Sequence, residues 1–171
     1  ECNVKRQLGL ISQSKLTREG KKQAKILSQK LKNIKLDYIF SSNLLRARQT
    51  AEIIAKSQGL KVMIKKELRE RSYGKFNSKT EAQIDKAIGK KFTAYKKMPP
   101  EKKFKYKLVA NMESEQESLK RFKKTLDQLV ARHPKKRILI ITHNNLIRNF
   151  LINIGVAKFN KINKYPIDTA N

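Results

Sequence analysis

Arg46, Glu70 and His143 each follow a short apolar stretch that is typical of a β-strand. A guanidinium and an imidazole can hold the oxygens of an oxyanion, and a carboxylic acid beside them can donate a proton. Taken singly, these residues have ordinary explanations: a solvated helix arginine, a surface salt-bridge glutamate and a structural histidine. Taken together, they predict a phosphate clamp with a carboxyl proton donor beside it.

The elements that would position these residues can be recognised from hydrophobic periodicity. Strand-like runs at 38–40, 62–64 and 137–142 alternate with helical patterns, one of which begins after Thr17. The apolar residues of that first helix recur at spacings of three and four: Ala24, Leu27, Leu31 and Ile34. Similar patterns follow Ser42, span 119–129 and follow His143, and Ser42 is the predicted cap of the helix after it.

This alternation predicts an α/β fold in which a mostly parallel sheet is covered by helices on both faces, giving three layers. In such open sheets the carboxyl ends of the strands meet at one edge, where ligands bind. We therefore expect the residues that follow the three strands to share one crevice. We treat residues 1–171 as one domain.

The stretch from about 77 to 110 departs from this alternation. It contains an amphipathic helical pattern, then Pro99-Pro100, then a run rich in lysine at 102–107. Residues 80–110 carry nine lysines and three acidic residues. We interpret the stretch as a helical insertion that ends in a basic loop. It could be a lid that attracts polyanionic substrates or an ordinary solvated surface.

Composition excludes several classes of protein. The 171 residues contain one cysteine, so neither a disulfide framework nor a multi-thiolate metal site is expected. No apolar run approaches the ~20 residues of a membrane span. The net charge of +27 is spread along the whole chain, without an interleaved arginine and aromatic surface. Nucleic-acid binding is therefore not favoured.

Five motifs in order along nearly the whole chain resemble the histidine phosphatase superfamily, which is also called phosphoglycerate mutase-like. They are Leu16–Gly20, Ser41–Ala51, Leu68–Gly74, Glu113–Ser114 with Glu117 and Arg121, and Thr142–Arg148. The resemblance implies the phosphoglycerate mutase-like form of the three-layer fold. It also implies chemistry in which a histidine attacks a phosphoryl group and becomes phosphohistidine. Fixed cationic groups hold the phosphoryl oxygens without a metal or a cofactor.

Carried over by position, the resemblance makes Arg46 the second arginine of the phosphate clamp. Glu70 becomes the proton donor to the leaving alkoxide, and His143 the second histidine of the clamp. A small phosphorylated molecule is the expected substrate. Because Glu70 must be protonated to donate, we expect its pKa to be raised.

Further positions match the family with less detail. Asn3 and Gly9 resemble phosphate-contacting positions after the nucleophile motif. Asn144 stands where the family has a glycine, and because Asn tolerates left-handed backbone we expect the local geometry to be kept. Arg71 and Tyr73 are candidates for the substrate side.

The Arg-His-Gly motif that would supply the nucleophile is absent from residues 1–171. Family spacing places it, with a first central strand, a few residues before Glu1, and a final strand after Asn171. We therefore expect residues 1–171 alone to lack turnover. The free cysteine and the type of reaction favour a cytoplasmic location.

Metal-independent phosphomonoesterase activity is the favoured function. The segment between Glu70 and His143 is short for the cofactor-dependent mutases, and Tyr73–Phe76 is more similar to the phosphatase branch. One alternative is a 2,3-bisphosphoglycerate-dependent phosphoglycerate mutase. Another is a non-catalytic module that binds polyanions on the same fold.

Overall fold

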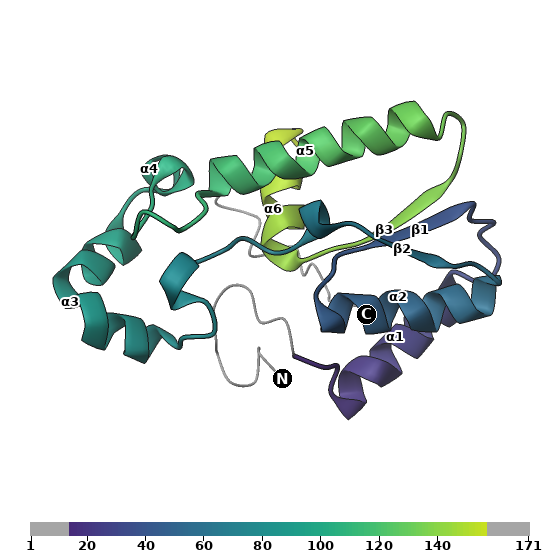
Figure 1. Ribbon diagram of the computed structural model, residues 1–171, viewed down its shortest axis with the longest axis horizontal. Coiled ribbons are helices and arrows are strands. Elements are labelled where there is room, and N and C mark those ends of the chain that lie inside the picture. Colours follow the sequence, from purple (N-terminus) through teal and green to yellow (C-terminus); the bar gives the residue numbers. More distant parts are fainter. Residues whose placement is uncertain (1–13, 157–171) are drawn as a thin grey trace.

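The computed structural model describes residues 14–156, which form helices packed around a small sheet (Figure 1). The α-helices and strands follow in the order α1 (Arg18–Lys30), β1 (Tyr38–Ser41), α2 (Leu45–Gln58), β2 (Val62–Ile64), α3 (Glu81–Lys97), α4 (Pro100–Lys105), α5 (Glu115–Arg132), β3 (Ile138–Ile141) and α6 (Asn144–Asn153). Two short 3-10 helices, η1 (Lys66–Leu68) and η2 (Gly74–Phe76), lie between β2 and α3. Within this part of the chain, no helix is long and apolar enough to cross a membrane.

The three strands form a parallel sheet in the order β2-β1-β3. In the central strand, Ile39 pairs with Val62 on one side and with Leu139 on the other. Because all three strands run in the same direction, their carboxyl ends lie at one edge. The parallel arrangement predicted from the alternation of strands and helices is confirmed.

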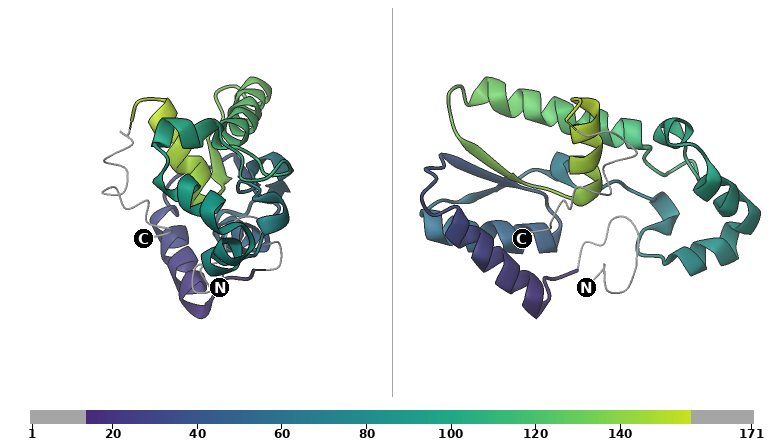
Figure 2. Two further views of the ribbon diagram at one scale, coloured as in Figure 1. Left: turned by 90° about the vertical axis from the view of Figure 1, so that its left-hand side faces the viewer. Right: turned by 180° about the vertical axis from the view of Figure 1, so that it is seen from behind.

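Successive residues of β1 point to opposite faces of the sheet, and each face is covered by helices. On one face, Ile39 packs in a buried cluster with Ala51 and Ile54 of α2, and Leu27 of α1 contacts the same cluster. On the other face, buried side chains from β1 and the helices α5 and α6 pack together: Phe40, Phe122, Leu129 and Leu146. The sheet therefore lies between two layers of helices (Figures 1 and 2).

Local sequence signals explain where most helices begin. The Thr17 hydroxyl accepts a hydrogen bond from the N–H of Gly20 at 3.0 Å and so caps α1, as predicted. Ser114 and Glu117 form a reciprocal capping box at the start of α5.

Two details of the predicted helices were wrong. The first helix ends at Lys30, so Ile34 lies beyond it with 39% of its surface exposed. The second helix has Leu44, not Ser42, as its N-cap residue. The Ser42 hydroxyl instead accepts a hydrogen bond from the N–H of Leu44 at 3.2 Å, one step before the helix.

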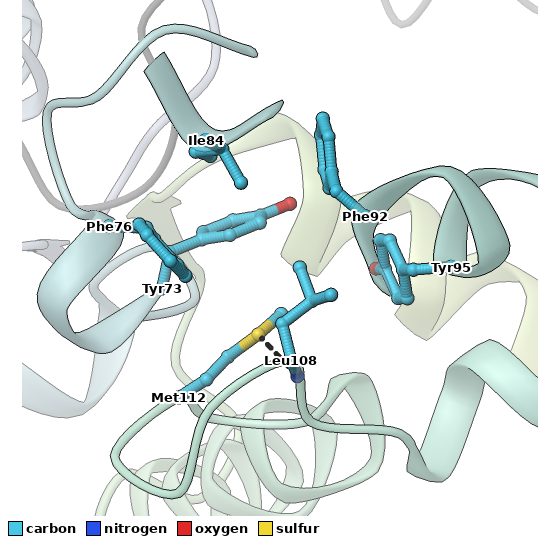
Figure 3. Close-up of a cluster of buried hydrophobic side chains, with 7 residues drawn as sticks. All are labelled: Tyr73, Phe76, Ile84, Phe92, Tyr95, Leu108 and Met112. Atoms are coloured by element: carbon cyan, nitrogen blue, oxygen red, sulfur yellow. Dashed lines mark hydrogen bonds between the residues drawn. The ribbon is translucent and has the colours of Figure 1, made fainter. Parts of the chain in front are cut away.

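The insertion packs with residues on either side of it in a separate hydrophobic cluster, which Figure 3 shows in close-up. Its buried residues come from the loop after β2, from α3 and from the segment before α5: Tyr73, Phe76, Ile84, Phe92, Tyr95, Leu108 and Met112. The predicted amphipathic helix is α3. The prediction of a basic loop at 102–107 was partly wrong, because residues 100–105 form the short helix α4, with Pro100 in its first turn.

Candidate active site

Arg46, Glu70 and His143 lie at the same edge of the sheet, each on a segment that follows a strand. Arg46 is in the first turn of α2, directly after β1. Glu70 follows η1, which continues from β2, and His143 is the residue between β3 and α6. Parallel pairing of the strands is what brings these three distant segments together.

His143 is held from both ring nitrogens. Its Nδ1 lies 3.3 Å from Nη2 of Arg46, and its Nε2 lies 2.8 Å from the Ser42 hydroxyl oxygen. Burial, together with the charges of Arg46 and Arg121, lowers the pKa of His143 from 6.5 to about 3. The imidazole is therefore neutral at pH 7.

Glu70 is a buried carboxyl group, with 7% of its surface exposed. Its Oε1 accepts a hydrogen bond from the N–H of Arg71 at 2.8 Å, and the N–H of Asn145 also donates to it. Burial raises the pKa of Glu70 above its usual value, although these two hydrogen bonds and the charges of Arg71 and Arg46 act in the opposite direction. A raised pKa is what a proton donor at neutral pH needs.

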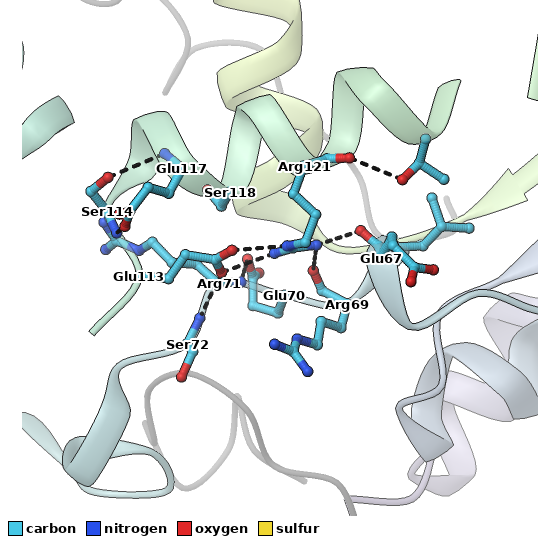
Figure 4. A network of polar contacts seen from close by, with 12 residues as sticks. Glu67, Arg69, Glu70, Arg71, Ser72, Glu113, Ser114, Glu117, Ser118 and Arg121 are labelled. Carbon is cyan, nitrogen blue, oxygen red and sulfur yellow. Dashed lines mark hydrogen bonds and ion pairs between the residues drawn. The ribbon is translucent and has the colours of Figure 1, made fainter. Parts of the chain in front are cut away.

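Arg121 of α5 holds the segment that carries Glu70 (Figure 4). Its Nε and Nη2 donate to the two carboxylate oxygens of Glu113 at 2.8 and 2.9 Å. Its Nη1 donates to the backbone carbonyls of Glu67 and Arg69, the second at 3.1 Å. One guanidinium thus fixes the backbone on the N-terminal side of the candidate proton donor.

The same segment is tied down at two more points. The Glu113 carboxylate accepts a hydrogen bond from the N–H of Ser72 at 3.2 Å, beyond Glu70. The Thr142 hydroxyl donates to the carbonyl of Leu68 at 2.7 Å, which links this segment to the end of β3. Glu70 therefore lies on a backbone that is fixed on both sides.

Arg71 and Tyr73 are placed in the interior, with 4% and 9% of their surfaces exposed. Arg71 forms an ion pair with Glu115 at 3.1 Å, donates a hydrogen bond to the Tyr73 hydroxyl, and lies 4.6 Å from the centre of the Tyr73 ring. These contacts join the Glu70 segment to α5 and to the insertion. A role for either residue on the substrate side stays a prediction.

The remaining predicted positions are less informative. Asn144 is exposed and begins α6 with helical backbone, so its tolerance of left-handed conformation is not used. Asn3 and Gly9 lie outside the described residues. In the part of the chain that the structure describes, no group of three or more His, Cys, Asp or Glu side chains could hold a metal ion.

Sequence reasoning missed the roles of three residues in this site. The sequence indicates Ser42 only as a helix cap, yet its hydroxyl contacts the ring of His143. The sequence presents Glu113 and Arg121 only as parts of a motif and assigns them no structural role. The sequence signal for Glu113 and Arg121 is that a glutamate and an arginine occur within the same motif. This signal does not indicate which backbone groups the two side chains bind.

A model of the histidine phosphatase superfamily (branch 1) matches residues 1–171. A probable phosphoglycerate mutase GpmB from Photorhabdus laumondii is 39% identical over 74 residues, which are 43% of this chain and 34% of the relative. Phosphoserine phosphatase 1 from Hydrogenobacter thermophilus is 28% identical over 147 residues, which are 84% of this chain and 67% of the relative.

Among solved structures, a mycobacterial glucosyl-3-phosphoglycerate phosphatase in complex with inorganic phosphate superposes with a TM-score of 0.74 at 23% identity. The match covers 91% of this chain and 76% of that one. At this level of identity the superposition establishes the fold only. The family match over the whole sequence goes further, because it covers residues 1–171. This chain belongs to the histidine phosphatase superfamily (branch 1).

Proposed function

We propose that the complete protein is a metal-independent phosphomonoesterase that acts through a phosphohistidine intermediate. The observation that carries the proposal is the convergence of an arginine, a neutral histidine and a buried carboxyl group at one sheet edge. This set supplies an oxyanion clamp and a proton donor, which are the two things that phosphate ester cleavage needs besides a nucleophile. The attacking histidine belongs to the Arg-His-Gly motif that we expect before Glu1.

In this proposal Arg46 and His143 hold the equatorial oxygens of the phosphoryl group while the nucleophile attacks phosphorus. The Glu70 carboxyl group gives its proton to the leaving alkoxide oxygen as the P–O bond breaks. Water then attacks the phosphohistidine, and Glu70, now ionised, takes up the proton of that water. Fixed donors at the oxyanion need no reorganisation during the reaction, which is how they lower its barrier.

The test is hydrolysis of a small phosphate ester by the complete protein and its Glu70→Gln variant. A glutamine preserves shape but cannot donate a carboxyl proton, so we expect kcat to fall by about 10²- to 10⁴-fold. An ester with a good leaving group, such as an aryl phosphate, should lose much less than an alkyl phosphate. Equal losses with both esters, or no loss, would show that Glu70 is not the proton donor.

A mutase remains the second candidate, because a relative that is 39% identical over 74 residues is named as a probable phosphoglycerate mutase. The same residues can return the phosphoryl group to a substrate hydroxyl in place of water. Supplying the complete protein with 3-phosphoglycerate and a trace of 2,3-bisphosphoglycerate, which would phosphorylate the histidine of such a mutase, separates the two reactions. Release of inorganic phosphate supports the phosphatase, and formation of 2-phosphoglycerate supports the mutase.

A further inference from the structure

The Ser42 hydroxyl lies behind His143, on the side of the ring away from Arg46. Ser42 has no exposed surface, and His143 has 6% of its surface exposed. A guanidinium can only donate hydrogen bonds, so Nδ1 of His143 must accept the one from Arg46 at 3.3 Å. In a neutral imidazole the proton is then on Nε2, which donates to the Ser42 oxygen at 2.8 Å.

This tautomer is unsuited to holding an oxyanion. A phosphoryl oxygen that approaches Arg46 meets the lone pair of Nδ1, and two acceptors repel each other. Nδ1 must therefore carry a proton when the oxyanion is bound. The ring can gain it as a cation, or it can remain neutral and move its proton from Nε2 to Nδ1.

The surroundings of the ring disfavour the cation. Burial, and then the charges of Arg46 from α2 and Arg121 from α5, lower the pKa of His143 to about 3. Glu70, at the same sheet edge, does not offset these charges as a free carboxylate would, because burial raises its own pKa. In the ligand-free site a third positive charge is therefore unfavourable, whereas an exchange of tautomers adds no charge.

We propose that Ser42 is a positioning residue whose hydroxyl allows His143 to exchange tautomers when an oxyanion binds. The inference rests on the proposed function, because the oxyanion is the phosphoryl group of the substrate. A hydroxyl is both donor and acceptor, so rotation about its C–O bond converts it from the acceptor of Nε2–H to the donor toward Nε2. The Ser42–His143 hydrogen bond is thus kept in both states.

The protons balance without a change in charge. One proton leaves Nε2 for water, and one from water arrives at Nδ1, where it is donated to the phosphoryl oxygen. The Ser42 oxygen keeps its bond from the N–H of Leu44 at 3.2 Å throughout. Arg46 turns its donor from Nδ1 to the same phosphoryl group.

Nitrogen-15 NMR of ring-labelled histidine tests this directly in the complete protein. Residues 1–171 contribute two histidines, so the spectrum of a His143→Gln variant identifies the His143 signals among those of His133 and of the histidine proposed before Glu1. Without ligand at pH 7.5 we expect protonated Nε2 and unprotonated Nδ1 in His143, and the reverse at saturating inorganic phosphate. A doubly protonated ring, or an unchanged tautomer with phosphate bound, would overturn the inference.

A variant pair gives a second, independent readout. Ser42→Ala removes the hydroxyl that holds the ring in both tautomers, so the imidazole is no longer fixed toward the phosphoryl group. We expect phosphate affinity at pH 7.5 to fall about tenfold.

Ser41→Ala is the matched control. Ser41 is equally buried, and its hydroxyl donates to the backbone carbonyl of Ser42 at 3.1 Å instead of hydrogen-bonding to the ring. Ser41→Ala should keep the phosphate affinity of the wild type, and equal affinities in all three proteins would contradict a role for Ser42. Phosphorus-31 line broadening measures phosphate binding and so distinguishes a failure of the proposed function from a failure of this inference. Absence of phosphate binding by the wild type refutes the proposed function, whereas binding without tautomer exchange refutes only this inference.

Discussion

Charged and titratable side chains are buried or held by hydrogen bonds at the strand-end site, whereas those of the basic insertion are mostly exposed. At the site, Glu70 and His143 are buried, and Arg121 makes hydrogen bonds to a carboxylate and two carbonyls. In the insertion the buried residues are apolar or aromatic, and the lysines of α3 and α4 lie mostly toward solvent. The ion pair at its end, Lys107 with Glu117, has side chains that are 36% and 48% exposed.

The difference shows that the number of charges does not make a site. Titratable groups become suited to catalysis where burial and fixed hydrogen bonds shift their pKa values and hold them in place. Exposed lysines contribute to a diffuse field that is screened by salt. The comparison can be tested by altering each region and measuring which property changes.

The largest effect on stability is expected for Arg121→Met. The change leaves the Glu113 carboxylate and the carbonyls of Glu67 and Arg69 without their donor, and should lower the free energy of unfolding by about 4 kcal/mol. Urea unfolding measures this. The control is Lys107→Ala, which breaks an exposed pair and should cost less than about 0.5 kcal/mol. Similar losses in both variants would show that the two kinds of pair do not differ.

Leu108→Ala tests whether the insertion is held by the separate apolar cluster in which it packs. Leu108 has no exposed surface, so truncation should cost about 3 kcal/mol through lost burial and a cavity. Phosphate affinity should stay unchanged, because the cavity lies in the cluster of the insertion. Val130→Ala on α5, at a side chain with 67% exposed surface, is the control and should be nearly neutral. Loss of phosphate binding in Leu108→Ala would indicate that the two regions are coupled.

The pH dependence of stability should reveal the buried histidine. Folding lowers the pKa of His143 from 6.5 to about 3. Below pH 6.5 the unfolded chain therefore binds a proton at this residue that the folded chain does not bind. Between pH 6.5 and 4.5 the free energy of unfolding of the wild type should therefore fall by roughly 2–3 kcal/mol more than that of His143→Gln.

Glu70 has the opposite effect on the pH dependence of stability, since its raised pKa costs stability as pH rises above 4.5. Glu70→Gln should accordingly gain stability relative to the wild type at pH 7 but not at pH 4, and parallel pH curves for all three proteins would contradict both assignments.

The smallest effect is expected for the double change Lys90→Gln and Lys91→Gln in α3. Both side chains are exposed, so stability should change by less than about 0.5 kcal/mol and turnover of a small phosphate ester should be unaffected. Retention on heparin over a range of salt concentrations tests the polyanion-binding alternative. If these lysines contact a polyanion, the slope of log affinity against log salt will decrease by about two.

Much of the fold could be predicted because its signals are local. Apolar spacing located the strands and most helices, and a hydroxyl at position 17 marked the start of α1. The meeting of Arg46, Glu70 and His143 followed from one general rule, that parallel strands end at a common edge. The end of α1 and the helix α4 were missed, because helix ends depend on weak local preferences that tertiary packing overrides.

By itself, the sequence determined the order of the elements, the family, and which residue types would stand at the strand ends. Only the tertiary structure decided the partners of those residues. Ser42 and His143 are 101 positions apart, and Arg121 reaches a carbonyl 54 positions away. Such pairs leave no periodic trace in the chain, because they depend on how the helical layers are placed against the sheet, and burial in that arrangement is what shifts the pKa values of Glu70 and His143.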